Sequence, residues 1–235
     1  MQNKFIKNSG TLLGFTLAEV LITLGVIGVV AAMTLPTLIA NYQKKVLGIQ
    51  LKKEVSVIEN YFRQIKADEG VDYIYQTSVF VDDRFLDFEK FCDYFKLEYM
   101  PENSKFNKPL TSVGGKGAYN KDGSCFGFET LNYSTIYLDV NCDKGPNKIG
   151  YDRFAWTYMA ELPESFIFKS IYPLTNSEIP EFKEKIKELK QTAISDEDAE
   201  AVWTKFGSQA LQYLMQNNWE IDYWKNSLKE AVFIF

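Results

Sequence analysis

The chain has 235 residues, a length that fits one globular domain with an extended segment, or two small domains. Lys and Arg total 26 against 31 Asp and Glu, so the formal charge is −5 and the chain lacks the basic surface that sequence-independent nucleic-acid binding requires. The absence of histidine excludes Ser-His-Asp and Cys-His catalysis and histidine-ligated metal sites. No pair of carboxylates stands out as an alternative, so we expect a protein that is not an enzyme and has no nucleic-acid partner.

The N-terminal region is apolar. Residues 20–40 carry no charged side chain, and at about 1.5 Å of rise per residue a helix of this length crosses a hydrocarbon core of roughly 30 Å. A short leader with two lysines precedes it and ends at Gly14. Three interpretations are open: a secretory signal peptide cut after Ala32, a signal anchor that is never cut, or a leader cut ahead of the apolar segment, which then stays in the mature protein.

One acidic residue distinguishes these interpretations. Glu19 is the only charged residue between Lys7 and Lys44, and an acidic side chain in a bilayer costs roughly 2.5–3.5 kcal/mol. An ordinary signal peptide or anchor has no use for it. A free amine at Phe15, four residues earlier, or the same amine of a neighbouring subunit would neutralise the carboxylate.

Residues 14–20 read Gly-Phe-Thr-Leu-Ala-Glu-Val, and Pro36 follows within the apolar run. In these features the chain resembles the type IV pilin and type II secretion pseudopilin family. The resemblance implies that a prepilin peptidase cuts between Gly14 and Phe15 and methylates the new amine of Phe15. It also implies that Glu19 assists the docking of each incoming subunit into a filament.

The resemblance implies a single-pass protein of the bacterial inner membrane with its head in the periplasm, later part of a periplasmic or surface filament. Expected partners are the prepilin peptidase, other pilin or pseudopilin subunits, the inner-membrane assembly platform and the membrane itself. Four lysines follow the apolar segment, against the positive-inside tendency, so this orientation rests on the resemblance. The lack of cysteine after Cys142 favours a pseudopilin modestly over a pilus subunit. A non-polymerising, membrane-anchored binding head and a secreted enzyme with a cleaved signal peptide are the alternatives.

The helix should continue well beyond the membrane segment. Apolar residues recur at helical spacing on one face, which predicts packing against a core: Leu47, Leu51, Val55, Ile58, Phe62 and Ile65. We therefore expect a leader at 1–14, a helix over 15–66 (15–40 transmembrane or filament core, 41–66 amphipathic) and an α+β head over 67–235. Pro36 lacks the amide that would bond Ala32, which predicts a kink or a melted turn.

A small antiparallel sheet is predicted to cover this apolar stripe. Segments 125–131, 135–140 and 153–162 are rich in β-branched and aromatic residues. With a two-residue loop between the first two strands, Cys125 faces Cys142 directly, which favours a disulfide; two buried free thiols are the alternative.

Oxygen-bearing side chains at Asp139, Asn141 and Asp143 have the alternating spacing of calcium loops, and Asp152 could close the shell. Compared with a calcium loop, this segment has its glycine later in the sequence and lacks the glutamate that closes the loop. Solvated turn residues therefore explain the pattern equally well. The same loop looks like one that recurs in bacterial prepilin-type proteins, which supports a structural role. Calcium is therefore a possible cofactor.

Beyond Pro173 the pattern becomes helical again. We expect one helix to open at Ser177 and another at Ser195, both as additions to the head. Residues 219–224 alternate enough to suggest a last short strand; a subunit contact is an alternative, and core or edge packing is favoured for their apolar side chains.

Overall fold

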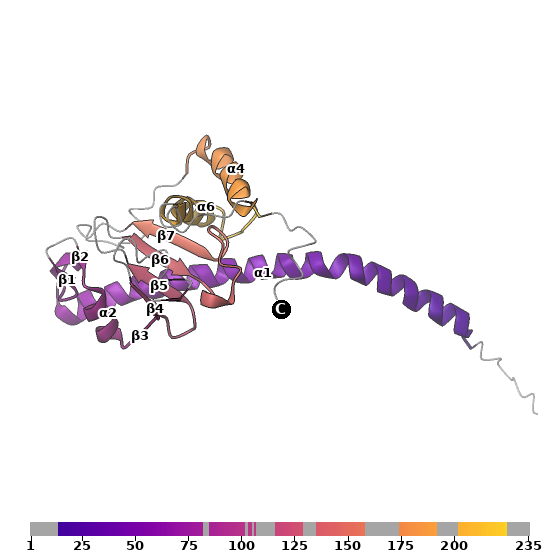
Figure 1. Ribbon diagram of the computed structural model, residues 1–235, viewed down its shortest axis with the longest axis horizontal. Helices are drawn as coiled ribbons and strands as arrows, with labels where there is room; N and C mark the ends of the chain where they lie inside the picture. Colours follow the sequence, from indigo (N-terminus) through magenta and orange to yellow (C-terminus); the bar gives the residue numbers. More distant parts are fainter. Residues whose placement is uncertain are drawn as a thin grey trace, which may run out of the picture.

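A single long helix organises the molecule, for which we describe a computed structural model (Figure 1). The structure describes residues 14–81, 85–101, 103–104, 106, 116–128, 135–157, 174–191 and 202–224. It contains a long apolar N-terminal helix, a five-stranded antiparallel sheet and further helices, which is the expected α+β layout. Of the predicted leader, only Gly14 lies within the described residues.

Helix α1 (Leu17–Glu69) has 53 residues and is about 80 Å long. Thr16 caps its N-terminus, and Gly70, in the left-handed conformation at φ 68°, ends it. The helix is continuous across Pro36, so the turn there is not melted; only the gentle curvature of the projecting half is visible (Figure 1). Proline removes one backbone hydrogen bond, and the bonds on either side keep the helix intact.

The two halves of α1 have opposite environments. From Gly14 to Ile39 the side chains are exposed or half-exposed, and Ala40 is the first buried one. In the second half, the six residues of the predicted apolar stripe are all buried, with Leu51, Val55, Ile58 and Ile65 fully inaccessible. The predicted stripe is therefore confirmed, and it anchors the head on the helix.

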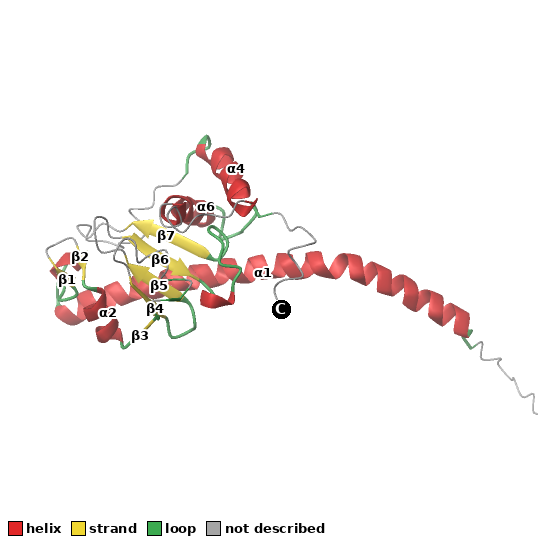
Figure 2. Cartoon of the chain, viewed as in Figure 1, coloured by secondary structure: helices red, strands yellow, loops and turns green. Residues whose placement is uncertain are grey.

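The sheet crosses this second half of α1 (Figure 2), and its strands lie in the order β3-β4-β5-β6-β7, all neighbours antiparallel. The strands are β3 (Glu98–Tyr99), β4 (Lys116–Tyr119), β5 (Cys125–Phe128), β6 (Thr135–Asp139) and β7 (Arg153–Thr157). The three predicted strands begin where expected, and their predicted continuations at 129–131 and 158–162 lie outside the described residues. Strands β3 and β4 were not predicted.

Side chains alternate between the two faces of the sheet. Phe126, Phe128, Ile136, Leu138 and Phe154 belong to the core that includes the stripe of α1. On the opposite face, a smaller cluster forms around the fully buried Tyr137 and Trp203.

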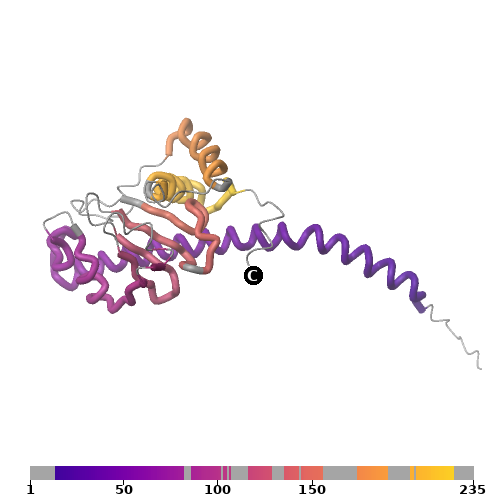
Figure 3. The backbone as a smooth tube through the Cα atoms, in the orientation of Figure 1, coloured from indigo at the N-terminus to yellow at the C-terminus, as the bar shows by residue number. Residues whose placement is uncertain are grey.

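Shorter elements complete the head. Between α1 and β3 lie η1 (Ile74–Gln76), β1 (Phe80–Val81), β2 (Phe85–Leu86) and α2 (Phe88–Phe95); η3 (Cys142–Lys144) follows β6. Near the C-terminus lie α4 (Glu178–Gln191), the π-helix η4 (Trp203–Gly207) and α6 (Ser208–Gln216). Both η4 and α6 contact β7, and α4 contacts α6, so these helices lie on one side of the sheet (Figure 3). Helix α4 confirms the helix predicted from Ser177, whereas the predicted start at Ser195 lies outside the described residues.

The strand predicted at 219–224 is wrong. Asn218 and Trp219 have positive φ angles, which break an extended path, and the segment is irregular. Its apolar side chains do pack into the core, as favoured from the sequence: Ile221, Tyr223 and Trp224 are buried.

Candidate assembly site at the start of the long helix

Thr16 and Glu19 form a reciprocal capping box at the first turn of α1. The Thr16 backbone N–H and the Thr16 hydroxyl both donate to Glu19 Oε2, each at 2.8 Å. The Glu19 N–H donates in return to Thr16 Oγ1 at 3.2 Å. The box satisfies two backbone donors that a helix start leaves free, and it places a negative charge where the helix dipole favours it.

The expectation that Glu19 has no use within an ordinary anchor is therefore incomplete, because its own chain provides a partner. Both hydrogen bonds that the carboxylate accepts go to Oε2, and Oε1 accepts none from the described residues. The carboxylate thus keeps one oxygen for a further donor.

The predicted cleavage position is accessible. Phe15 is 87% exposed, and a side chain at Gly14 would meet no atom within 4 Å. Neither residue belongs to the helix, which begins at Leu17. Cleavage of the peptide bond between Gly14 and Phe15 would leave Phe15 ahead of Thr16. The capping box would then stay intact, with the new free amine of Phe15 close to it.

The exposed half of α1 is long and apolar enough to cross a membrane. Its exposed large side chains include Leu17, Leu21, Ile22, Leu24, Val26, Ile27, Val29, Val30, Met33, Leu35 and Leu38. Soluble monomers rarely leave so large an apolar surface in water, and contact with lipid or with another protein fits such a surface.

Cys125 and Cys142 are joined in a disulfide, with their Cα atoms 5.2 Å apart. The predicted register is nevertheless wrong, because Cys125 pairs with Asp139 across the β5–β6 ladder. Cys142 lies in η3, where the chain turns back past the end of β6 and brings the two thiols together. Cys92, the remaining cysteine, is buried in the core.

The loop that follows β6 is held by ionic and backbone contacts. Asp139 is fully buried, and its Oδ2 accepts from Arg153 Nε at 2.9 Å. Asp152 accepts from the backbone N–H groups of Asn147 and Lys148, at 2.8 and 2.6 Å. Burial, reinforced by the neighbouring Asp152, raises the pKa of Asp139 to about 7, although Arg153 favours the ionised form.

These residues do not fit the calcium site considered from the sequence. Asp139 and Asp152 already face a guanidinium and backbone donors, and a cation would have to displace them. Asn141 donates its amide to the Gly145 carbonyl, and the side chain of Asp143 lies outside the described part of the chain. Within the described residues, no three acidic or cysteine side chains are grouped so that they could hold a metal ion.

A buried polar cluster that was not predicted from the sequence lies between α1 and the β4–β5 turn. Glu54 is 2% exposed and bonds to Asn120 and Ser124 of that turn. The burial of Glu54 could have been predicted from its position, because residue 54 lies three places after Leu51 and four before Ile58, on the buried face of the helix.

Two features therefore bear on function. One is the contrast between the exposed apolar half of α1 and its buried second half, and the other is the amino-acid sequence of residues 14–20. Comparisons of this chain with protein-family models, with curated proteins and with solved structures found no match.

Proposed function

We propose that this protein is a pilin-like structural subunit, processed by a prepilin peptidase, that assembles into a type II secretion pseudopilus or a type IV pilus-like filament. One observation carries the proposal: a continuous helix has an exposed apolar half with an acidic first turn, and a second half buried under a globular head. Such a helix can rest in a bilayer as a monomer and transfer to a bundle of identical helices without changing its fold.

The apolar half supplies the driving force for bundling. Each large side chain that leaves water gains on the order of 1.5–3 kcal/mol, and lipid or neighbouring helices provide this equally well. Packing and polar contacts therefore determine whether the apolar helix is more stable in the membrane or in the filament.

Glu19 is the polar contact that favours the filament. Its Oε2 is occupied by Thr16, while Oε1 can accept from the amine of Phe15 on a neighbouring subunit. Pairing the two opposite charges offsets the cost of holding a carboxylate in an apolar surrounding.

The proposal includes a location and partners. The head lies in the periplasm on a single-pass anchor, and the subunit meets the prepilin peptidase, the inner-membrane assembly platform and other pilin or pseudopilin subunits. Methylation of the Phe15 amine would retain its positive charge.

Two substitutions separate assembly from helix capping. Thr16→Ala removes the hydroxyl cap, at a cost of about 1 kcal/mol, and leaves the carboxylate; Glu19→Ala removes the carboxylate. We expect Glu19→Ala to accumulate processed monomer in the membrane, and Thr16→Ala to retain most of the cross-linkable oligomers. Cross-linking in intact cells, followed by fractionation, measures both.

A second candidate, a membrane-anchored head that does not polymerise, is favoured by the capping box, which gives Glu19 a local role. On that account the two variants behave alike and neither changes the oligomer pattern. Equal behaviour of Thr16→Ala and Glu19→Ala would therefore contradict the filament proposal.

A further inference from the structure

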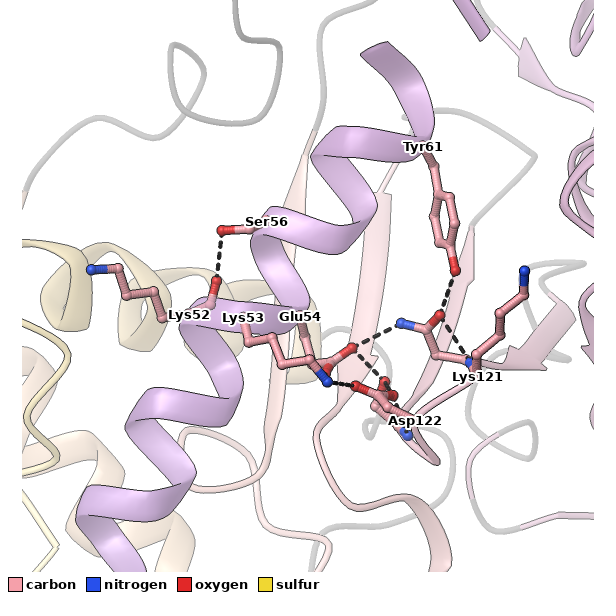
Figure 4. Close-up of polar contacts among 9 residues, drawn as sticks. Lys52, Lys53, Glu54, Ser56, Tyr61, Lys121 and Asp122 are labelled. Carbon is pink, nitrogen blue, oxygen red and sulfur yellow. Dashed lines mark hydrogen bonds and ion pairs between the residues drawn. The ribbon is translucent and has the colours of Figure 1, made fainter. Parts of the chain in front are cut away.

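The head is fastened to α1 by a buried polar cluster, drawn in Figure 4. Asn120 Nδ2 donates to Glu54 Oε2 at 2.8 Å, and Ser124 Oγ lies 2.6 Å from the same oxygen. Glu54, Asn120 and Ser124 are 2%, 5% and 1% exposed. Because the two partners flank the β4–β5 turn, these contacts tie the turn, residues 120–124, to the helix.

A second carboxylate lies at the same place. Asp122 Oδ1 accepts from the Ser124 backbone N–H at 3.1 Å, and its Oδ2 contacts the Lys53 ammonium. The Lys53 ammonium also lies 3.6 Å from Glu54 Oε1. Lys53 is itself well exposed, so it neutralises one carboxylate more effectively than two.

The hydroxyl of Ser124 lies within hydrogen-bond distance of both acids, 2.6 Å from Glu54 and 3.0 Å from Asp122. A hydroxyl carries one proton and can donate to only one of them. The other acid must then supply a proton of its own for both contacts to be hydrogen bonds. Asp122 is partly exposed and contacts the Lys53 ammonium directly, whereas Glu54 is almost fully buried, so Glu54 is the acid that holds the proton.

We propose that the proton on Glu54 is a latch: it fastens the turn 120–124 to α1, and its loss at higher pH loosens the turn from the helix. Without the proton, the ionised Glu54 lies beside the Asp122 carboxylate and only one of the two can accept the Ser124 hydroxyl, so repulsion between like charges weakens the contact of the turn with α1. This latch belongs to the head and does not depend on the proposed filament role.

The electrostatics of the site agree with this geometry. Burial, followed by the contact with Asp122, raises the pKa of Glu54 to about 7. Burial alone would raise the pKa of Asp122, but its hydrogen bonds with Glu54 and Lys53 outweigh that effect and hold it below its usual range.

Two further titratable groups border the site. The Tyr61 hydroxyl donates to Asn120 Oδ1 at 2.6 Å, and burial raises the pKa of Tyr61, so it stays a neutral donor through the neutral range. The Lys121 side chain points away from Glu54 (Figure 4). Neither group can replace the proton of Glu54.

The direction of the pH effect follows from the sign of the shift. A carboxyl group whose pKa is higher in the closed state binds its proton more tightly there, so closure is strongest below the ordinary value of 4.5. Closure weakens as the pH rises from 4.5 and stops changing above about 7. From these two values, the opening equilibrium increases about tenfold between pH 6 and pH 8.

Hydrogen exchange of the full chain in detergent micelles tests the latch. After correction for the intrinsic exchange rate, amides of the peptide covering residues 118–126 should lose about tenfold in protection between pH 6 and pH 8. Glu54→Gln keeps the shape and supplies an N–H in place of the proton, so its protection should not change with pH. Glu59→Gln, which alters a buried carboxylate paired with Arg63 on the same helix, is the control and should follow the wild type.

Constant protection in the wild type, or the same pH response in Glu54→Gln, would overturn the proposal. Infrared difference spectra between pH 6 and pH 8 give a second readout that does not require the variant to exchange normally. Asp139, whose pKa is also raised to about 7, contributes to the protonated carboxyl band in every variant. The wild type and Glu59→Gln should therefore lose a larger band over this range than Glu54→Gln. A loss of equal size in the wild type and in Glu54→Gln would equally refute the latch.

Discussion

Replacing Gly48 of α1 by alanine should destabilise the protein, whereas the same substitution at an ordinary helical glycine stabilises it. Replacing such a glycine by alanine usually stabilises a protein by about 0.5–1 kcal/mol. At Gly48, however, an added Cβ would overlap the carbonyl oxygen of Trp219, which crosses the helix at this point. Backbone atoms cannot rotate away as a side-chain tip can, so the C-terminal segment has to retreat.

The free energy needed to displace the C-terminal segment follows from the contacts that hold it. The segment is held by Lys44, which donates to the Trp224 carbonyl, and by Tyr223 and Trp224, which donate to the Gly150 carbonyl at 2.6 and 3.1 Å. Overpacking costs about 1–3 kcal/mol, and weakening one of these hydrogen bonds adds about 1 kcal/mol. After the helical gain, we expect Gly48→Ala to destabilise the head by about 2 kcal/mol, or roughly 4–8 °C in Tm.

Urea and thermal unfolding of the full chain in micelles, followed by tryptophan fluorescence, measures this loss. Gly28→Ala is the matched control, because a Cβ there meets no atom within 4 Å and lies outside the head. The control should leave the unfolding midpoint of the head unchanged. A midpoint for Gly48→Ala equal to or above that of the wild type would show that the C-terminal segment does not rest on α1 as described.

Three further predictions concern the head. Arg153→Met removes the guanidinium that donates to the buried Asp139, so urea unfolding should show a loss of about 1–3 kcal/mol. Replacing Cys125 and Cys142 together by alanine opens a link of sequence separation 17, and calorimetry should show a loss of about 3 kcal/mol. Burial raises the pKa of Cys92 to about 12, so iodoacetamide at pH 8 should label it only in urea, as mass spectrometry will show. Native labelling of Cys92, or unchanged stability in either variant, would contradict the packing described.

The long helix could be predicted because its signal is local and repeated. Leu51, Val55 and Ile58 recur at the helical period, and a pattern sustained over many turns identifies both the helix and its buried face. The capping box could also have been predicted, since Thr16 and Glu19 fit the Thr-x-x-Glu pattern.

Features that depend on which strands pair, and in which register, were harder to predict. Strand β4 contains Gly117 and Ala118, which have low strand propensity, and it exists through its neighbours in the sheet. The register of β5 on β6 depends on the connection between them, so assuming a two-residue loop shifted the predicted partner of Cys125 from Asp139 to Cys142. The helix α2 has apolar residues at helical spacing after the cap Asp87, but its short length made this signal weak.

The buried cluster illustrates what a sequence cannot show. Glu54 and Asn120 are 66 residues apart, and nothing local to either one indicates that a turn of the sheet will meet the helix there. The same holds for Gly48, whose close contact with Trp219 depends on the path of a distant segment.

The most direct test of the proposed function is the N-terminus of the protein isolated from its native membrane. Intact-mass and N-terminal peptide analysis should identify Phe15 as the first residue, with one added methyl group on its amine. A chain that begins at Met1 or at Met33 would contradict processing ahead of the apolar helix, and with it the role of this subunit in a filament.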